Sequence, residues 1–243
     1  MSNGTSKLQT FKQSDAQSAA AEAGENLNLF LAENKKLPIL LMLSGGSALS
    51  ILDYVGPAVL GANLSLSLLD ERFSQDPLIN NFAQLQKTDF YKDAFEAEAS
   101  FFGTLPRPNE TIAELRGRWD KNLKLWHNEN PKGLIVATLG MGTDGHTSGI
   151  LPFPENPDEF NRLFNGKDWT VQYRADGKSK YPERVTTTIP FLKNIDFAFA
   201  LVCGAEKRAK FDDLQSGKHT NAELPAMVWH KMKDVKVFTD LEL

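Results

Sequence analysis

The sequence predicts an α/β protein with a mainly parallel sheet that is flanked by helices on both faces. Residues 134–139 form an unbroken apolar run with Ile, Val and Thr in it, as expected for a strand that is covered on both faces of a parallel sheet. Residues 38–43 and 197–203 form similar runs, and stretches of helical composition lie between them. This alternation is typical of a Rossmann-like architecture, to which we expect a small irregular lobe with some β-structure to be added.

Composition limits the class of protein. A chain of 243 residues is long enough for one large α/β domain, which we expect over residues 1–243, with residues 1–14 loose and residues 154–177 as the irregular lobe. The net charge of -4 argues against nucleic acid or an anionic membrane as the partner, because both require a basic surface. A small anion can still bind locally.

Cysteine usage and the start of the chain predict the compartment. The single cysteine, Cys203, cannot form an internal disulfide and is expected to be a buried thiol in a reducing environment. Residues 1–18 lack the apolar core of a signal peptide, and no apolar stretch approaches the roughly 20 residues of a membrane span. No metal-spaced cluster of Cys and His is visible. We therefore expect a cytoplasmic protein without a metal.

The first expected strand opens into a glycine turn. A helix over residues 15–32 precedes the strand at residues 38–43, which runs into Ser44-Gly45-Gly46-Ser47 and a helix-compatible segment, residues 48–54. Such a turn brings backbone N–H groups together at the positive end of a helix dipole, which suits an anion such as phosphate. The alternative is a tight turn without a ligand. The stretch is not a Walker-type nucleotide loop, because it lacks the G-x-x-x-x-G-K-[ST] pattern.

The second expected strand ends in charged residues. Residues 64–70 alternate and then become apolar, and the run ends in Asp70-Glu71-Arg72. These side chains are expected at the ligand edge of the sheet, or alternatively as a salt-bridged strand end. Residues 80–91 then have helical spacing, and residues 99–105 could form a short strand. Thr111 and Glu114 form a capping box at the start of a helix whose tryptophans we expect in the core.

The central strand, residues 134–139, runs into a loop with three glycines, Gly140, Gly142 and Gly145. Asp144 and His146 lie in this loop. Ligands of open α/β sheets collect at the carboxyl ends of the strands, where a carboxylate two residues from an imidazole can move protons. The alternative is a loop histidine that is merely hydrogen-bonded.

The same loop contains a literal G-x-G-x-x-G, the pattern of a dinucleotide-binding turn. That interpretation requires a long helix directly after the loop. Pro152, Pro154 and Pro157 follow within twelve residues of Gly145, so a long helix cannot continue there. We therefore do not expect a dinucleotide site.

The last third of the chain adds basic candidates. Residues 171–173 are expected as a short strand in the lobe, and Arg184 introduces a β-branched strand at residues 185–189. After the strand at residues 197–203, Lys207 falls in the first turn of a helix over residues 205–214, where a cation opposes the helix dipole unless an anion binds. Arg184 and Lys207 are therefore candidates to complement the Ser44–Ser47 turn. A last strand is expected at residues 235–239.

Together these pieces resemble 6-phosphogluconolactonase, within the family that includes glucosamine-6-phosphate deaminase. The motifs occur in the family's order over most of the chain. They are S-G-G-S from Ser44, D-E-R from Asp70, G-M-G-T-D-G-H-T from Gly140, R-V-T-T-T-I-P from Arg184, G-A-E-K from Gly204 and L-P-A from Leu224. An Asn that follows D-P in the family could be Asn80 or Asn81 here.

The resemblance implies hydrolysis of 6-phospho-D-glucono-1,5-lactone in the oxidative pentose phosphate pathway, without metal or organic cofactor. It implies that His146 is the general base that activates water and that Asp144 supports the imidazolium. An imidazole suits this role because it titrates near neutral pH. The positions that it implies around the phosphorylated sugar are Ser44, Gly45, Gly46, Ser47, Asp70, Arg72, Gly142, Arg184 and Lys207.

Two alternatives stay open. The deaminase branch places a glutamate five residues after the loop histidine, where this chain has Leu151, which cannot relay protons. A non-catalytic sugar-phosphate-binding protein would keep the anion site but would not need both Asp144 and His146. The S-G-I-L-P that follows D-G-H-T replaces the family's usual A-S-L-F-P, a departure that bears on the sugar specificity. A monomer or a small homo-oligomer is expected.

Overall fold

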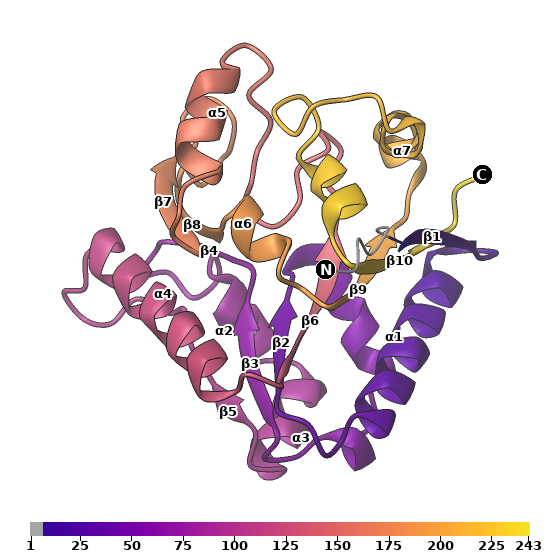
Figure 1. Cartoon of the computed structure of the whole chain (residues 1–243), viewed down its shortest axis with the longest axis vertical. Helices are drawn as coiled ribbons and strands as arrows, with labels where there is room; N and C mark the ends of the chain where they lie inside the picture. The colour runs from indigo at the N-terminus through magenta and orange to yellow at the C-terminus, as the bar shows by residue number, and fades with distance from the viewer. Residues whose placement is uncertain (1–6) are drawn as a thin grey trace.

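The computed structural model describes residues 7–243 and contains a seven-stranded sheet whose paired strands are all parallel (Figure 1). The strand order is β1-β10-β9-β6-β2-β3-β5. Their bounds are Lys7–Lys12 for β1, Asp234–Thr239 for β10, Phe197–Val202 for β9, Leu134–Gly140 for β6, Ile39–Leu43 for β2, Leu64–Leu68 for β3 and Ser100–Phe101 for β5. The mainly parallel α/β fold predicted from the apolar runs is confirmed.

Both faces of the sheet are covered. Alternate residues of β2 enter two different cores: Leu40 and Met42 pack in one, and Ile39, Leu41 and Leu43 in the other. Helix α1 (Ala16–Glu33) belongs to the second core, and helix α4 (Ile112–Glu129) to the first. In Figure 1 these two helices lie on opposite sides of the sheet. This double cover explains why the strands have continuous rather than alternating apolar sequences.

Helix α4 begins where the sequence predicts. Thr111 and Glu114 make the reciprocal capping-box hydrogen bonds, and Trp119 is fully buried. The indole Nε1 of Trp119 donates to Ser67 Oγ at 2.9 Å, and that hydroxyl donates to the Phe102 carbonyl at 3.0 Å. Ser67 of β3 is therefore buried with its hydroxyl fully hydrogen-bonded, and Trp119 is part of the core.

A second sheet continues from the first. Strands β4 (Asp70–Arg72), β8 (Glu183–Thr187) and β7 (Thr170–Arg174) form a three-stranded antiparallel sheet in the order β4-β8-β7. The Asp70-Glu71-Arg72 motif was expected at the junction of a strand and a loop, but it is itself a short strand of this second sheet. Its pairing places Arg72 opposite Arg184.

Two expectations about irregular segments are wrong. Residues 7–12 are not loose, because β1 pairs in parallel with β10 from Lys7 to Lys12; residues 1–6 lie outside the described residues. Residues 154–177 are more regular than expected, because they contain helix α5 (Pro157–Phe164). The Asn and Pro that suggested irregularity start this helix, since Asn156 caps it and Pro157 takes its first turn. The short strand expected at residues 171–173 is present as β7.

Three helical segments differ from expectation. The Ser44–Ser47 turn leads into a 3-10 helix, η1 (Gly46–Tyr54). Residues 80–91 form the end of a turn, helix α2 (Asn81–Leu85) and the start of helix α3 (Asp89–Glu96), which Thr88 caps. Residues 205–214 comprise a 3-10 turn, η3 (Ala205–Lys207), and most of helix α7 (Arg208–Ser216), so Lys207 precedes the α-helix. The remaining elements are η2 (Pro57–Val59), α6 (Ile189–Leu192) and η4 (Pro225–Lys231).

Cys203 is half-buried rather than fully buried. Desolvation raises the pKa of its thiol to about 11. The thiol therefore stays protonated at neutral pH. None of the helices in residues 7–243 combines the length and the apolar character that a membrane crossing needs.

Candidate active site

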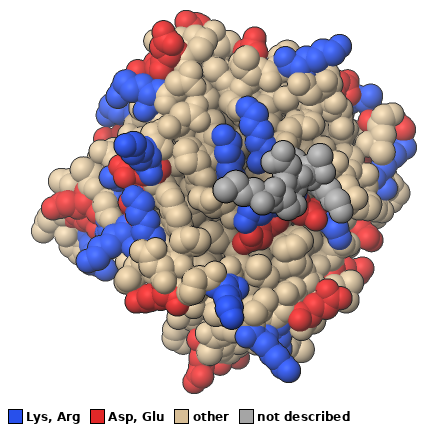
Figure 2. Space-filling model, viewed as in Figure 1, with Lys and Arg blue, Asp and Glu red and all other residues tan. Residues whose placement is uncertain are grey.

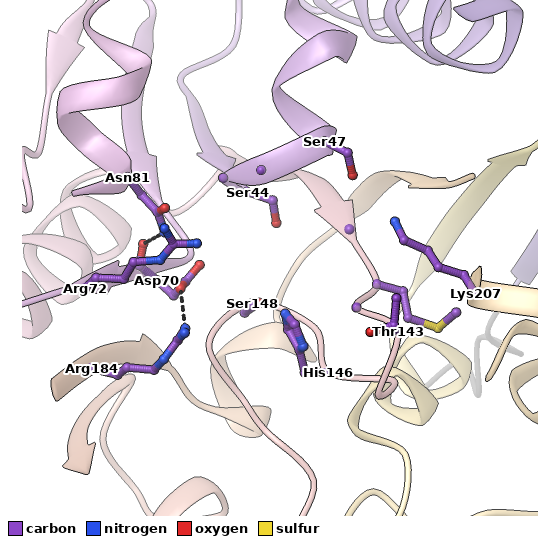
Figure 3. Close-up of a pocket in the computed structure, with 15 residues that line it drawn as sticks. Ser44, Ser47, Asp70, Arg72, Asn81, Thr143, His146, Ser148, Arg184 and Lys207 are labelled. Atoms are coloured by element: carbon purple, nitrogen blue, oxygen red, sulfur yellow. Dashed lines mark hydrogen bonds and ion pairs between the residues drawn. The ribbon is translucent and has the colours of Figure 1, made fainter. Parts of the chain in front are cut away.

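A pocket of about 290 Å³ lies where the carboxyl ends of the central strands meet the second sheet (Figure 3). Every candidate substrate-binding residue from the sequence lines it, together with His146 and five further residues. The lining residues are Ser44, Gly45, Gly46, Ser47, Asp70, Arg72, Asn81, Gly140, Met141, Gly142, Thr143, His146, Ser148, Arg184 and Lys207. The structure thus brings together motifs that lie far apart in the chain, from Ser44 to Lys207.

Four neighbouring parallel strands deliver these motifs in a fixed order across the pocket. Lys207 follows β9, His146 follows β6, the Ser44–Ser47 turn follows β2, and Asp70 follows β3. The connection that follows β2 leads to its neighbour β3 on one side, whereas β6 is the neighbour of β2 on the other side. The strand order therefore reverses between β2 and β6. A crevice therefore opens between β2 and β6, the position at which open α/β sheets bind ligands.

His146 and Asp144 form a close pair. The ring Nδ1 of His146 lies 2.5 Å from Asp144 Oδ1, and the backbone N–H of His146 donates to the same oxygen at 3.1 Å. An ionised carboxylate can only accept, so Nδ1 carries the proton, and in the neutral ring Nε2 is the free acceptor. Figure 3 shows the imidazole in the middle of the pocket, with Asp70 and Arg184 on one side and Lys207 on the other.

Burial and hydrogen bonding act in opposite directions on the pKa of Asp144. Desolvation raises it, but the hydrogen bond and the charge of His146 lower it more, so that the pKa lies below its ordinary value. Asp144 is therefore ionised throughout the neutral range. It does not line the pocket itself, and it holds the ring from behind.

Gly142 permits this pair to form. A Cβ atom at position 142 would lie 2.2 Å from both Cε1 and Nδ1 of His146 and 2.7 Å from Asp144 Oδ1. The Gly142 N–H donates to the His146 carbonyl at 2.9 Å, which closes the loop tightly around the ring. The glycine of the G-x-G-x-x-G pattern therefore makes room for an imidazole, and no long helix follows the loop.

The Ser44–Ser47 turn forms another wall of the pocket. Ser44 is anchored by its backbone N–H, which donates to Thr138 Oγ1 of β6 at 3.2 Å. Gly46 has φ +66 and begins η1, whose first N–H groups have no partner within the helix. These donors still suit an anion, but a 3-10 helix supplies them where an α-helix was expected.

The opposite end of the pocket is formed by the second sheet. Asp70 and Arg184 are both less than a tenth exposed, and Arg184 Nη1 lies 3.5 Å from Asp70 Oδ2. The guanidinium of Arg72 lies 5.5 Å from the centre of the Tyr181 ring. Three cationic side chains and one carboxylate line the pocket in all, so its charge favours an anionic ligand.

Glu71 faces away from the pocket and supports this end. Its carboxylate is fully buried and accepts hydrogen bonds from the backbone N–H groups of Arg72, Asn81 and Phe82 and from Thr104 Oγ1. Desolvation nevertheless raises its pKa to about 7. One side chain thereby ties β4 to the start of α2.

The structure distinguishes the two candidate asparagines. Asn80 turns into its own loop, where Nδ2 donates to the carbonyls of Arg72 and Ser74. Asn81 lines the pocket, and its Nδ2 donates to the Asp70 carbonyl at 3.1 Å. The sequence alone left these two residues undecided.

Four buried side-chain atoms have no hydrogen-bond partner within the described part of the chain, and all four belong to residues that line this pocket. They are Arg72 Nε, Asn81 Oδ1, Ser148 Oγ and Arg184 Nε. Buried polar atoms are normally paired, so this concentration marks the pocket as a polar binding site. Sequence reasoning missed Ser148 and did not single out Asn81, because a buried atom without a hydrogen-bond partner can be recognised only in the folded structure.

The remaining histidines lie outside the pocket. His219 contacts Asp213 at 3.2 Å, and His230 contacts the Leu214 carbonyl at 2.8 Å. Within residues 7–243, no group of three or more His, Cys, Asp or Glu side chains is arranged to hold a metal ion. On the face seen in Figure 2, basic and acidic side chains of the described residues are interspersed.

Comparisons with known proteins agree with the geometry. Residues 12–238 match the model of a family described as glucosamine-6-phosphate isomerases/6-phosphogluconolactonase. A 6-phosphogluconolactonase of Neisseria meningitidis serogroup A is 26% identical over 227 residues, which are 90% of this chain and 95% of the relative. A 6-phosphogluconolactonase of Pseudomonas aeruginosa is 32% identical over 139 residues, which are 56% of this chain and 55% of the relative.

Solved structures share the fold. The crystal structure of a 6-phosphogluconolactonase from Shewanella baltica has a TM-score of 0.75 at 16% identity, with 96% of each chain covered. A putative 6-phosphogluconolactonase from Neisseria gonorrhoeae has a TM-score of 0.71 at 22% identity, with 96% of this chain and 99% of that chain covered.

Proposed function

This chain belongs to the glucosamine-6-phosphate isomerase/6-phosphogluconolactonase family, and we propose that it hydrolyses 6-phospho-D-glucono-1,5-lactone to 6-phosphogluconate. It would thereby act in the oxidative pentose phosphate pathway. The observation that carries the proposal is the His146 ring, held by Asp144 at 2.5 Å in the middle of a pocket with three cationic side chains. A phosphorylated lactone needs both a general base at its carbonyl and cations at its phosphate.

His146 is the general base. Nε2 takes a proton from a water molecule while the water oxygen bonds to the lactone carbonyl carbon. The carbonyl becomes a tetrahedral oxyanion, and the cationic side chains of the pocket stabilise its charge. Asp144 keeps Nδ1 protonated and stabilises the imidazolium that forms.

The second half of the reaction returns the proton. The bond between the carbonyl carbon and the ring oxygen breaks, and the imidazolium Nε2–H donates its proton to that oxygen, which becomes a hydroxyl group. The new carboxyl group then ionises and releases a proton to solvent. Atoms and charges balance with water as the only co-reactant.

The phosphate binds at the end of the pocket formed by Lys207 and the Ser44–Ser47 turn. Lys207 is 8% exposed, and the turn offers backbone N–H groups. The sequence makes Arg184, like Lys207, a candidate to complement the Ser44–Ser47 turn, but Figure 3 places Arg184 and Lys207 on opposite sides of His146. We therefore assign Arg184, with Asp70 and Arg72, to the end of the substrate that is remote from the phosphate. Holding both ends aligns the carbonyl with the water.

Assays of the purified protein test this function. We expect it to accelerate hydrolysis of freshly generated 6-phosphogluconolactone well above the spontaneous rate, followed as acid release at pH 6.5–7. Rates equal to the spontaneous rate would contradict the proposal, and product binding without turnover would favour the non-catalytic sugar-phosphate-binding alternative. The deaminase alternative predicts ammonia release from glucosamine 6-phosphate. Leu151 disfavours it, because this residue is 3% exposed and packs in the apolar core.

A further inference from the structure

Ser148 combines two unfavourable features at one position. Its φ is +53, in the left-handed region that a side chain other than glycine disfavours, and it is one of three such residues within residues 7–243. It is also 7% exposed, and its Oγ has no partner in the described part of the chain. Glycine would remove both costs. Strain and unpaired polar atoms persist together mainly where a ligand uses them.

The backbone around Ser148 is held rigidly in place. Ile150 N–H donates to the Thr147 carbonyl at 3.0 Å, which closes a turn with Ser148 and Gly149 at its centre. Gly149 N–H donates to Thr186 Oγ1 at 3.0 Å, and its carbonyl accepts from the buried hydroxyl of Tyr173 at 2.5 Å.

Position 149 allows no side chain, which fixes the turn further. A Cβ atom on Gly149 would lie 2.9 Å from the Cβ atoms of both Asp70 and Thr186. The turn is therefore pressed against β4 and β8. The backbone of Ser148 is therefore preorganised at the wall of the pocket that this residue lines.

The location of Ser148 indicates which part of the substrate it meets. It lies two residues after His146, and Figure 3 places it between His146 and the Asp70–Arg184 pair. Lys207 lies on the other side of His146. With the phosphate bound near Lys207, the carbonyl carbon of the lactone lies at His146. The carbon that carries the 2-hydroxyl group is bonded to the carbonyl carbon and lies beyond it, on the side of Ser148.

We propose that Ser148 is a specificity-determining residue whose hydroxyl pairs with the 2-hydroxyl group of the lactone. This inference rests on the proposed lactonase function and deepens it. A hydroxyl can both donate and accept, so the pair is satisfied whichever partner supplies the proton. A substrate without this hydroxyl would leave Ser148 Oγ buried and unpaired, and would be a poorer substrate for that reason.

The test crosses two enzymes with two substrates. The kcat/KM of the wild type and of Ser148→Ala is measured on the lactone and on its 2-deoxy analogue, each generated from the corresponding sugar phosphate. We expect Ser148→Ala to lose about tenfold on the full lactone and less than twofold on the analogue. Ser148→Gly also removes the hydroxyl, and glycine tolerates the positive φ at this position. It should show the same losses as Ser148→Ala, which would exclude a folding defect as their cause. Ser216→Ala, on an exposed serine of α7, should leave both rates unchanged.

The outcomes separate the two proposals. A wild-type protein that does not accelerate either lactone overturns the function and this inference together. If the wild type is active and Ser148→Ala loses equally in kcat/KM on both substrates, or loses nothing, the inference alone is overturned. A loss of more than a thousandfold on both lactones would assign the Ser148 hydroxyl to direct nucleophilic attack and would also overturn it.

Discussion

Arg72 and Arg184 are directly opposite each other in the antiparallel ladder of β4 and β8, and Asp70 of the same β4 strand pairs with Arg184. Two guanidinium groups therefore converge on one end of the pocket. Like charges at neighbouring positions are unfavourable unless a carboxylate or a ligand offsets them. The pairing connects the stability of the second sheet with the chemistry of the pocket.

The Asp70–Arg184 pair should matter for stability. Arg184→Met leaves the Asp70 carboxylate buried without its cation, and we expect the free energy of unfolding to fall by about 3 kcal/mol. Arg174→Met is the matched control on the same sheet, because Arg174 is 60% exposed and its pairing with Asp176 should contribute less than about 1 kcal/mol. Urea unfolding measures both. Equal effects of the two variants would show that the buried pair contributes no more to the free energy of unfolding than the exposed pair.

Glu71 should make stability depend on pH. Its pKa in the folded protein is about 7, above the ordinary 4.5, so the folded state favours the protonated form. The stabilising contribution is full below pH 4.5 and is lost as the pH rises through 7. Wild-type stability relative to Glu71→Gln should therefore fall by about 3 kcal/mol between pH 5 and pH 8. Urea unfolding at several pH values measures this difference, and a difference that is constant with pH would refute the prediction.

Gly142→Ala should disable the site without unfolding the protein. The added methyl group would lie 2.2 Å from the His146 ring, so the ring must move away from Asp144. We expect kcat to fall by about a hundredfold or more. Gly166→Ala is the control, because a Cβ atom there meets nothing within 4 Å. Wild-type kcat in Gly142→Ala would mean that the position of the ring is not critical.

Asp144→Asn should impair turnover more than binding. An amide can donate to Nδ1, which would place the ring proton on Nε2 and remove the acceptor that faces the water. We expect kcat to fall by about 10²-fold or more with the Kd for product changed less than threefold. Isothermal titration with 6-phosphogluconate and steady-state kinetics measure the two quantities. A change confined to product affinity would assign Asp144 to binding.

Much of the fold could be predicted because its strands are locally encoded. The runs of β2, β6 and β9 are continuously apolar, and glycines mark the ends where the motifs converge. Strand β1 could not be predicted in this way. Its sequence is short and mostly polar, and its partner β10 begins at Asp234, at the other end of the chain. Edge pairing of that kind leaves no local pattern.

The site was predictable in its motifs but not in its details. The sequence identified His146, Asp144 and the charged residues that meet in the pocket, and their catalytic and binding roles stay predictions, as does the single domain over residues 1–243. Asn81 and Asn80 differ only in which way one loop turns, and Ser148 is distinguished only by its φ and its unpaired hydroxyl. Backbone angles and hydrogen-bond partners of this kind arise from tertiary packing.

The central claim is that the His146 ring activates water in this pocket, and His146→Ala tests it most directly. Rates of 6-phosphogluconolactone hydrolysis, corrected for the spontaneous reaction, are compared with the Kd for 6-phosphogluconate in the same preparations. The account predicts that kcat falls by about 10² to 10⁴-fold while the Kd for product changes by less than threefold. A His146→Ala variant that hydrolyses the lactone at the wild-type rate would contradict it.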